Sequence, residues 1–436
     1  MTLPELRRHL INAELLSWQA WIRHPARSMA RLIPLRAKEA INQAAGRPIF
    51  DLSFYLQFQP NSLPAFHIAI DRIEYLPPPA GVKRVTLVTP HLGPGGAEAV
   101  LLEIASALCG SGFETLLIAT HSRDDRWRQR WDAKVAHVYD LASAVPVEHR
   151  VAEVCSIAAS WNCNFVLVQN SLFGYAALPP IRRLLPDAKL MDVVHNVDES
   201  WDIVAATASV AHCLDVRVAV SDLVRRRLLA AGTPEDRIHL ISSGVELDRF
   251  RPAPVHSGPE QQILFAGRLD PVKRPLLLVD IAAELTALRK KRDFRFIIAG
   301  DGPEEEPLRN RIREAGLNDV FDLRGQVHDL AHLYAASDVV ILPSRSEGVP
   351  LVILEALASA RPLIASNVGG IPEALDASCG FLIDPAPDEA AAFARALTTL
   401  LDQPELRARM GAAGRRQIEA NYDIRRSREA YASLFD

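Results

Sequence analysis

The sequence lacks an excess of charge, paired cysteines and a long apolar run free of polar side chains, and each absence excludes a class of protein. The formal net charge is −4 over 436 residues, so no overall positive charge favours nucleic acid as a partner. The five cysteines include no C-x-x-C pair, which argues against a zinc site or a disulfide framework and fits a reducing compartment. Hydrophobic residues make up 49%, and the length allows two or three globular domains.

Membrane-spanning and secretory segments are not expected either. The N-terminus has no apolar core followed by small residues, so we predict no signal peptide. The longest uncharged stretch, residues 154–181, contains several side-chain amides and the pair Pro179-Pro180, which would be costly in lipid. We therefore expect a cytoplasmic protein.

The first 80 residues differ in composition from the rest of the chain. Residues 1–50 carry eight Lys/Arg against three acidic residues, and apolar side chains recur there at helical spacing around Trp18 and Trp21. Three consecutive prolines end the segment at Pro79. We predict a basic helical extension over residues 1–80. Two interpretations stay open: it lies on the inner face of an anionic membrane as a peripheral contact, or it packs as an arm on the body of the protein or on a partner.

After this segment, short β-branched runs alternate with helical patterns in two successive series. Such alternation predicts parallel sheets joined by right-handed crossovers, and hence two doubly wound α/β domains. We place these domains at 84–245 and 246–420, followed by a last helix at 421–436, because residues 243–259 are rich in glycine and proline. The expected strands cover residues 84–89, 116–118, 166–168, 191–194 and 216–220, then 263–266, 294–299, 339–342 and 363–365.

The loops that follow these strands carry the candidate site residues, because ligands of doubly wound sheets bind at the carboxyl ends of the strands. Gly267-Arg268 and Lys273 follow the strand over 263–266. A guanidinium and an ammonium on one such loop are able to converge on a diphosphate. The alternative is two solvated surface cations.

Two glutamates eight residues apart follow the strand over 339–342. Glu347 lies in a loop, and Pro350 suits the first turn of the helix that contains Glu355. The free amides after Pro350 would carry partial positive charge. Glu355 interrupts an apolar helix, so it needs a partner, and ribose hydroxyls would serve. The alternative is one capping and one salt-bridged glutamate.

Three glycine-containing loops and one histidine complete the candidate residues. Gly300 and the pair Gly369-Gly370 follow strands, where glycine allows the backbone to approach a ligand closely. The alternative is that these glycines only form turns. The loop around Gly95-Gly96 resembles a dinucleotide fingerprint, but its third glycine would fall at Glu98, which excludes that reading. His195 ends another expected strand, where a structural role is the alternative.

Together these motifs resemble the family-4 retaining glycosyltransferases of the GT-B fold, over roughly residues 84–436. The resemblance implies two Rossmann-like domains that face each other across a cleft, an N-terminal one for the acceptor and a C-terminal one for a nucleotide sugar. It also implies that the last helix crosses back to the first domain. Pro350, where glycine is common, and Ala360-Arg361-Pro362, where Gly-x-Pro is common, are departures that remove no charged group.

The resemblance also implies the roles of the site residues. Arg268 and Lys273 would grip the donor diphosphate, Glu355 would bind the ribose, and Glu347 would contact the transferred sugar beside His195. The family pattern has the Gly95-Gly96 loop approach the diphosphate. Further donor-binding residues in this set are Gly267, Gly300, Gly348, Val349, Leu351 and Val352.

The expected activity is transfer of a hexosyl group from a UDP- or GDP-linked sugar to a hydroxyl, with retention of configuration. The acceptor would be a glycan or lipid-linked glycan of the cell envelope. No D-x-D sequence occurs, so we expect neither a metal nor another cofactor. The cation pair argues against a glycosidase, which has no diphosphate to bind. A nucleotide-sugar epimerase and a silent nucleotide-sugar- or glycan-binding scaffold remain the alternatives.

Overall fold

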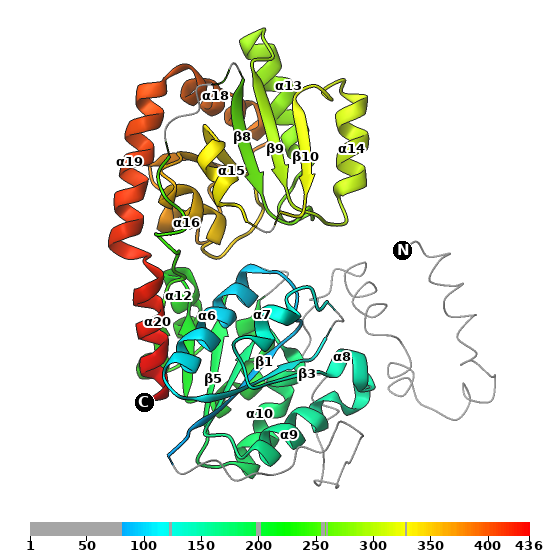
Figure 1. Cartoon of the computed structure of the whole chain (residues 1–436), viewed down its shortest axis with the longest axis vertical. Coiled ribbons are helices and arrows are strands. Elements are labelled where there is room, and N and C mark those ends of the chain that lie inside the picture. Colours follow the sequence, from blue (N-terminus) through cyan, green and yellow to red (C-terminus); the bar gives the residue numbers. More distant parts are fainter. Residues whose placement is uncertain (1–80, 122–123, 198–201, 254–257, 259, 328) are drawn as a thin grey trace, which may run out of the picture. The chain divides into compact units, whose positions relative to one another are not determined.

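The structure of the chain is a computed structural model, and it describes residues 81–121, 124–197, 202–253, 258, 260–327 and 329–436 (Figure 1). The predicted basic helical extension over residues 1–80 lies outside the described residues. The described residues divide into two compact units: one comprises those within 81–94, 108–193 and 202–217, and the other comprises those within 95–107, 194–197 and 218–436.

A seven-stranded sheet forms the centre of the N-terminal half of the chain. Its strand order is β3-β2-β1-β4-β5-β6-β7, the doubly wound order that reverses direction between β1 and β4. The pairs β1–β2, β2–β3, β1–β4 and β4–β5 are all parallel. The strands are β1 (Arg84–Thr89), β2 (Glu114–Ala119), β3 (His137–Asp140), β4 (Phe165–Gln169), β5 (Lys189–Val194), β6 (Val216–Ala219) and β7 (Ile238–Leu240).

The central strands of this sheet are buried along almost their whole length, as expected for parallel strands covered on both faces. Helices connect the strands in sequence. They are α6 (Gly96–Gly110), α7 (Arg128–Asp132), α8 (Leu141–Ala144), α9 (Arg150–Trp161), α10 (Leu172–Leu184), α11 (Ile203–Ala206) and α12 (Asp222–Ala230).

A buried ion pair lies inside this sheet, within the first unit. Asp192 on β5 and Arg217 on β6 are 0% and 1% exposed. The Arg217 Nη2 donates to Asp192 Oδ2 at 2.7 Å, and its Nε lies 3.2 Å from both carboxylate oxygens. The Tyr175 hydroxyl also donates to Oδ2, and Thr207 accepts from the same guanidinium. These contacts compensate two charges that would otherwise be costly to bury.

A six-stranded sheet forms the centre of the C-terminal half. Its order is β10-β9-β8-β11-β12-β13, which repeats the doubly wound arrangement and reverses between β8 and β11. The pairs in this sheet are parallel throughout. The strands are β8 (Gln261–Ala266), β9 (Phe294–Ala299), β10 (Phe321–Gly325), β11 (Val339–Leu342), β12 (Leu363–Ser366) and β13 (Gly380–Ile383).

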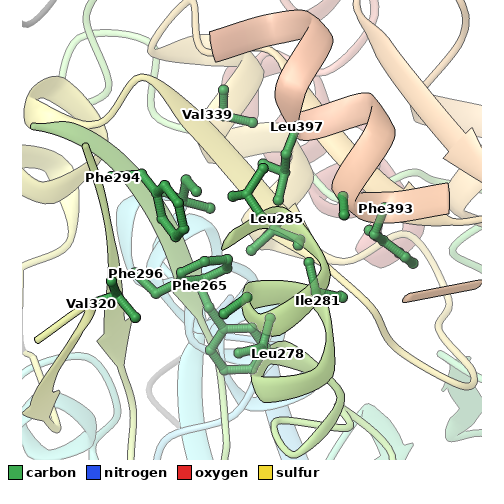
Figure 2. Close-up of a cluster of buried hydrophobic side chains, with 14 of the residues drawn as sticks. Phe265, Leu278, Ile281, Leu285, Phe294, Phe296, Val320, Val339, Phe393 and Leu397 are labelled. Carbon is green, nitrogen blue, oxygen red and sulfur yellow. The ribbon is translucent and has the colours of Figure 1, made fainter. Parts of the chain in front are cut away.

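Alternate strand residues of this sheet build two hydrophobic cores, one on each face. On the first face, shown in Figure 2, the rings of Phe265, Phe294 and Phe296 pack against apolar side chains of α13 (Leu277–Arg289) and α18 (Glu389–Asp402). On the other face, intervening residues such as Leu264 and Ile297 pack with α15 (Ala331–Ala336), α16 (Leu351–Ala358) and α19 (Pro404–Asn421). The remaining helices are α14 (Glu305–Glu314), α17 (Ile371–Ala374) and α20 (Ile424–Ala432).

Every strand expected from the sequence is present, and the two doubly wound sheets confirm the expected fold class. The sequence patterns do not predict β3, β7, β10 and β13. One local expectation needs correction: Pro350 is the N-cap residue of α16, with φ −73° and ψ 135°, and the first helical residue is Leu351. None of the described helices is long and apolar enough to cross a membrane.

The buried pair Asp192–Arg217 supplies a stability test. Because Asp192→Asn leaves the guanidinium buried without its counter-charge, we expect it to lower the free energy of unfolding by about 3–5 kcal/mol. Chemical denaturation measures this loss. The control is Asp132→Asn, which removes the carboxylate of an exposed Arg128–Asp132 pair and should have little effect. Equal stability of the two variants would contradict the role of the buried pair.

Candidate functional site

Four loops at the carboxyl ends of β8, β9, β11 and β12 contain most of the candidate residues. β8 and β11 are the neighbours between which the strand order reverses, so the crossover helices of the sheet diverge at this point. The loop after β8 meets the loop after β11 directly, because the Arg345 amide donates to the Val272 carbonyl at 2.7 Å. The backbone itself therefore brings the two most charged loops together.

The loops after β8 and β9 are packed so closely that only glycine fits between them. Gly300 has a φ of +155°, and a Cβ atom there would lie 1.8 Å from the Gly267 carbonyl oxygen. The Leu269 amide donates to the Asp301 carbonyl, and the Leu269 carbonyl accepts from the Glu304 amide, both at 2.8 Å. These contacts fix the backbone that carries Arg268.

Lys273 and Glu347, predicted separately from two motifs, form an ion pair. The Lys273 Nζ lies 2.5 Å from Glu347 Oε1, and the side chains are 21% and 11% exposed. The same oxygen accepts a 2.6 Å hydrogen bond from the hydroxyl of Ser344, which is fully buried. Both donors thus hold one carboxylate oxygen of Glu347. The spacing Ser-x-x-Glu is that of a capping box, whose side chains bond backbone amides, whereas here the hydroxyl of Ser344 bonds the carboxylate itself.

Arg268 lies on the same loop but has a different partner. Its Nη2 is 2.8 Å from Asp270 Oδ2, and its side chain is 64% exposed. The other oxygen of Asp270 accepts from the Val272 and Lys273 amides at 3.1 and 3.0 Å. Asp270 therefore shapes the loop and orients the guanidinium at once. We did not predict this role, although Asp followed by Pro is a turn signal.

The loop after β12 supports the backbone around Glu347. Gly369 has a φ of +57°, and a Cβ atom there would lie 2.0 Å from the Glu347 carbonyl oxygen. That carbonyl accepts from the Gly370 amide at 3.1 Å. Further along the same motif, the Glu373 carboxylate accepts from the Asp222 and Leu223 amides at the start of α12, within the second unit. The double-glycine motif thus has a clear structural role.

The N-terminus of α16 presents free amides beside this group. The Ile353 amide bonds to the Pro350 carbonyl, and Pro350 offers no side-chain cap. The amides of Gly348, Val349, Leu351 and Val352 donate no hydrogen bond within the part of the chain that the structure describes. With the helix dipole, such donors favour an anion.

Glu355 lies further along α16 and is held by a different residue. The Tyr334 hydroxyl on α15 donates to Glu355 Oε2 at 2.8 Å. Burial raises the pKa of the Glu355 carboxyl to about 7, although this hydrogen bond lowers it. The expected need for a partner is thus met in part by a tyrosine that belongs to none of the motifs. Tyr334 precedes Glu355 by 21 residues, and no sequence signal links them.

His195 and the pair Gly95-Gly96 lie outside these loops. His195 follows β5, and a Cβ atom on Gly348 would lie 2.4 Å from its carbonyl oxygen, both residues belonging to the second unit. Burial lowers the pKa of His195 to about 4, so its imidazole is neutral at pH 7. Gly96 begins α6, whose Ala99 amide bonds to the Gly95 carbonyl. A Cβ atom at Gly96 would meet nothing within 4 Å.

The structure therefore brings Gly267, Lys273, Gly300, Glu347 and Gly348 into one group of touching loops. Arg268 is on the same loop as Lys273, but its guanidinium is paired with Asp270. Glu355 is held separately by α15. Among the described residues, no group of three or more His, Cys, Asp or Glu side chains forms a metal-binding cluster.

Comparison with known proteins agrees with these motifs. Residues 248–417 match the model of glycosyl transferases group 1, and residues 94–249 match that of glycosyltransferase family 4. A D-inositol 3-phosphate glycosyltransferase of Kineococcus radiotolerans is 32% identical over 413 residues, which cover 78% of this chain and 92% of that relative. The chain therefore belongs to the family-4, group 1 glycosyltransferases.

Other relatives match over different lengths. A GDP-mannose-dependent alpha-(1-6)-phosphatidylinositol monomannoside mannosyltransferase of Mycobacterium tuberculosis is 28% identical, covering 78% of this chain and 95% of its own. A D-inositol 3-phosphate glycosyltransferase of Streptomyces scabiei is 35% identical over 204 residues, or 42% of this chain. The chain spans about half of that relative, 45% of its length.

Solved structures share the fold. Anabaena HepE in complex with UDP and glucose superposes with a TM-score of 0.69 at 18% identity, covering 81% of this chain and 99% of that one. A glycosyltransferase of Rickettsia africae gives a TM-score of 0.66 at 21% identity, covering 81% and 98%. These likenesses show the GT-B fold that the motifs imply.

The close approach at Gly300 can be tested with a second glycine as control. Gly300→Ala places a methyl group against the Gly267 carbonyl, so the two loops must separate. Gly316 also has a positive φ, +65°, but open space around its Cα atom. We expect thermal denaturation to show a clearly larger loss of stability for Gly300→Ala than for Gly316→Ala, whose cost of about 1 kcal/mol is conformational strain alone. Equal losses would mean that the loop contact is not restrictive.

Proposed function

We propose that this protein transfers a hexosyl group from a UDP- or GDP-linked sugar to a hydroxyl of a glycan or lipid-linked glycan, with retention of configuration. The observation that carries the proposal is the Lys273–Glu347 ion pair between the loops after β8 and β11, beside the free amides of α16. Cations and amides suit a diphosphate, and carboxylates suit sugar hydroxyls. Relatives named for GDP-mannose, and a fold neighbour solved with UDP and glucose, support this donor class.

The proposed chemistry follows from where charge develops. When the bond between the anomeric carbon and the phosphate oxygen breaks, the electron pair stays on the diphosphate and the sugar becomes oxocarbenium-like. Lys273, Arg268 and the α16 amides stabilise the leaving diphosphate. The diphosphate competes with Glu347 for the Lys273 ammonium, and the freed carboxylate then accepts hydroxyls of the sugar.

Retention requires the acceptor hydroxyl to attack the face that the diphosphate leaves. A new bond forms between that hydroxyl oxygen and the anomeric carbon, and the hydroxyl proton passes to a phosphate oxygen of the leaving group. In this proposal, the neutral His195 imidazole lies beside the sugar, the Gly95-Gly96 loop approaches the diphosphate, and Glu355 binds the ribose. Since protein cations supply the positive charge, the reaction proceeds without a divalent metal or another cofactor.

The role of the cations is tested by substitution. Lys273→Ala and Arg268→Ala each remove a charge that acts mainly on the leaving diphosphate, so kcat should fall by about 10²–10³. Turnover of UDP- and GDP-sugars with a glycan acceptor, followed by nucleotide release with and without chelator, measures this. Lys291→Ala, at an exposed lysine outside the site, is the control. Unchanged kcat in both site variants would contradict the assignment.

The same assay separates the alternatives that the sequence leaves open. Consumption of donor sugar without acceptor, giving an isomeric nucleotide sugar, would indicate an epimerase. Binding of nucleotide sugar with no turnover under any acceptor would indicate a scaffold. The anomeric configuration of the product, read by NMR coupling constants, decides between retention and inversion.

We also propose that the acceptor is reached at a membrane surface through residues 1–50, whose charge is strongly basic. The Mycobacterium tuberculosis relative, whose name includes a phosphatidylinositol monomannoside, supports a lipid-linked acceptor. The full chain should float with vesicles containing anionic phosphatidylglycerol, but not with neutral vesicles or when residues 1–50 are removed. Equal flotation of the full and shortened chains would end this part of the proposal.

A further inference from the structure

Tyr334 is a buried polar side chain that the sequence motifs leave unexplained. Its side chain is 0% exposed, it lies on the short helix α15, and its ring packs edge-on against Phe250 with centroids 5.8 Å apart. Its hydroxyl donates to Glu355 Oε2 at 2.8 Å. A fully packed ring has few alternative rotamers, so the hydroxyl stays in one place.

Glu355 has an asymmetric environment. Its neighbours on α16, Leu354 and Ala356, are fully buried, and the glutamate itself is half-buried. Oε2 accepts the Tyr334 hydroxyl, whereas Oε1 accepts no hydrogen bond from the described residues. A carboxylate partly withdrawn from water with one oxygen unsatisfied is ready to accept hydrogen bonds from a ligand.

We propose that Tyr334 is a positioning residue for nucleotide recognition: its hydroxyl fixes the ionised Glu355 carboxylate so that Oε1 accepts the ribose hydroxyls of the donor. This inference rests on the proposed function and goes beyond it by assigning a role to a residue outside the motifs. Tyr334 touches Glu355 rather than the reacting atoms, so its substitution changes nucleotide binding and not the chemical step.

The electrostatic surroundings give the inference a pH dependence. The groups that act on Glu355 are Tyr334 on α15, Arg249 and Asp329. Burial raises the pKa of Glu355 to about 7, the Tyr334 hydrogen bond and Arg249 lower it, and Asp329 raises it. Arg249 and Asp329 form an ion pair at 3.0 Å, and they act on the Glu355 pKa in opposite directions. The ionised form is the acceptor, so ribonucleotide binding strengthens as pH rises through about 7.

The test uses calorimetric titration of the full chain with UDP and GDP and with their 2′,3′-dideoxy analogues. Tyr334→Phe removes only the hydroxyl, so the affinity for the ribonucleotide should fall about tenfold, as for one hydrogen bond to a charged group. The affinity for the dideoxy analogue should not change. The midpoint of ribonucleotide affinity against pH should move upward, because a contribution that lowers the Glu355 pKa is lost.

The matched control is Tyr431→Phe on α20. Its hydroxyl is buried and meets no partner in the described part of the chain, so both nucleotides should bind as in the wild type. Equal loss of ribo and dideoxy affinity in Tyr334→Phe, or an unmoved midpoint, would assign Tyr334 to packing alone and overturn the inference.

The wild-type chain gives an independent readout should Tyr334→Phe prove unstable. The preference for ribo over dideoxy nucleotide should grow between pH 6 and pH 8, and a preference that does not change overturns the inference. A wild-type chain that binds neither UDP nor GDP contradicts the proposed function itself. A chain that binds one of them without preferring ribose leaves the proposed function standing and removes only the role of Glu355 and Tyr334.

Discussion

The ion pair between Lys273 and Glu347 is the contact on which the site depends. It joins the loops after β8 and β11, the two strands between which the order of the six-stranded sheet reverses. The topology of the sheet determines the position of the candidate site, because the crossover helices leave the sheet in opposite directions at this point. The glycine loops after β9 and β12 pack closely against the backbone of the two loops that carry these partners.

Each of the two glutamates of the candidate site is held through one of its carboxylate oxygens, but the two lie in different surroundings. Glu347 is fixed through Oε1 by an ammonium and a hydroxyl, whereas Glu355 is fixed through Oε2 by a phenol alone. Burial raises the pKa of the Glu355 carboxyl to about 7. The two carboxylates of this helix–loop segment thus differ in their partners and in their surroundings.

The sequence predicts the centre of each sheet well and its edges poorly. The strands β1, β4, β8 and β11 lie at the centres of the sheets and are rich in buried apolar residues because both faces are covered, so they are easy to recognise. The four unpredicted strands are the edges of the two sheets. Each of these strands is short, and most of its residues are only partly buried or exposed. Polar and apolar residues are therefore mixed along the strand without a clear alternation.

The residues of the candidate site also differ in how well the sequence predicts them. Residues within motifs, such as Arg268 and Glu347, are predicted because they are close in sequence to strand ends. Tyr334 is not, because its link to Glu355 exists only through the packing of α15 on α16. Asp270 and Ser344 are an intermediate case. Their positions in the sequence suggest a local structural role, but only the fold shows that their partners are Arg268 and Glu347.

In the proposed donor complex, the pairing of Lys273 with Glu347 makes capture of the diphosphate an exchange reaction. An incoming anion would gain only the difference between its own attraction to Lys273 and that of Glu347. A small anion that meets Lys273 alone would therefore gain little, whereas a ligand that also reaches the α16 amides would gain contacts for which no described residue competes. On this proposal, the internal pairing of Lys273 would disfavour small inorganic anions relative to a nucleotide sugar.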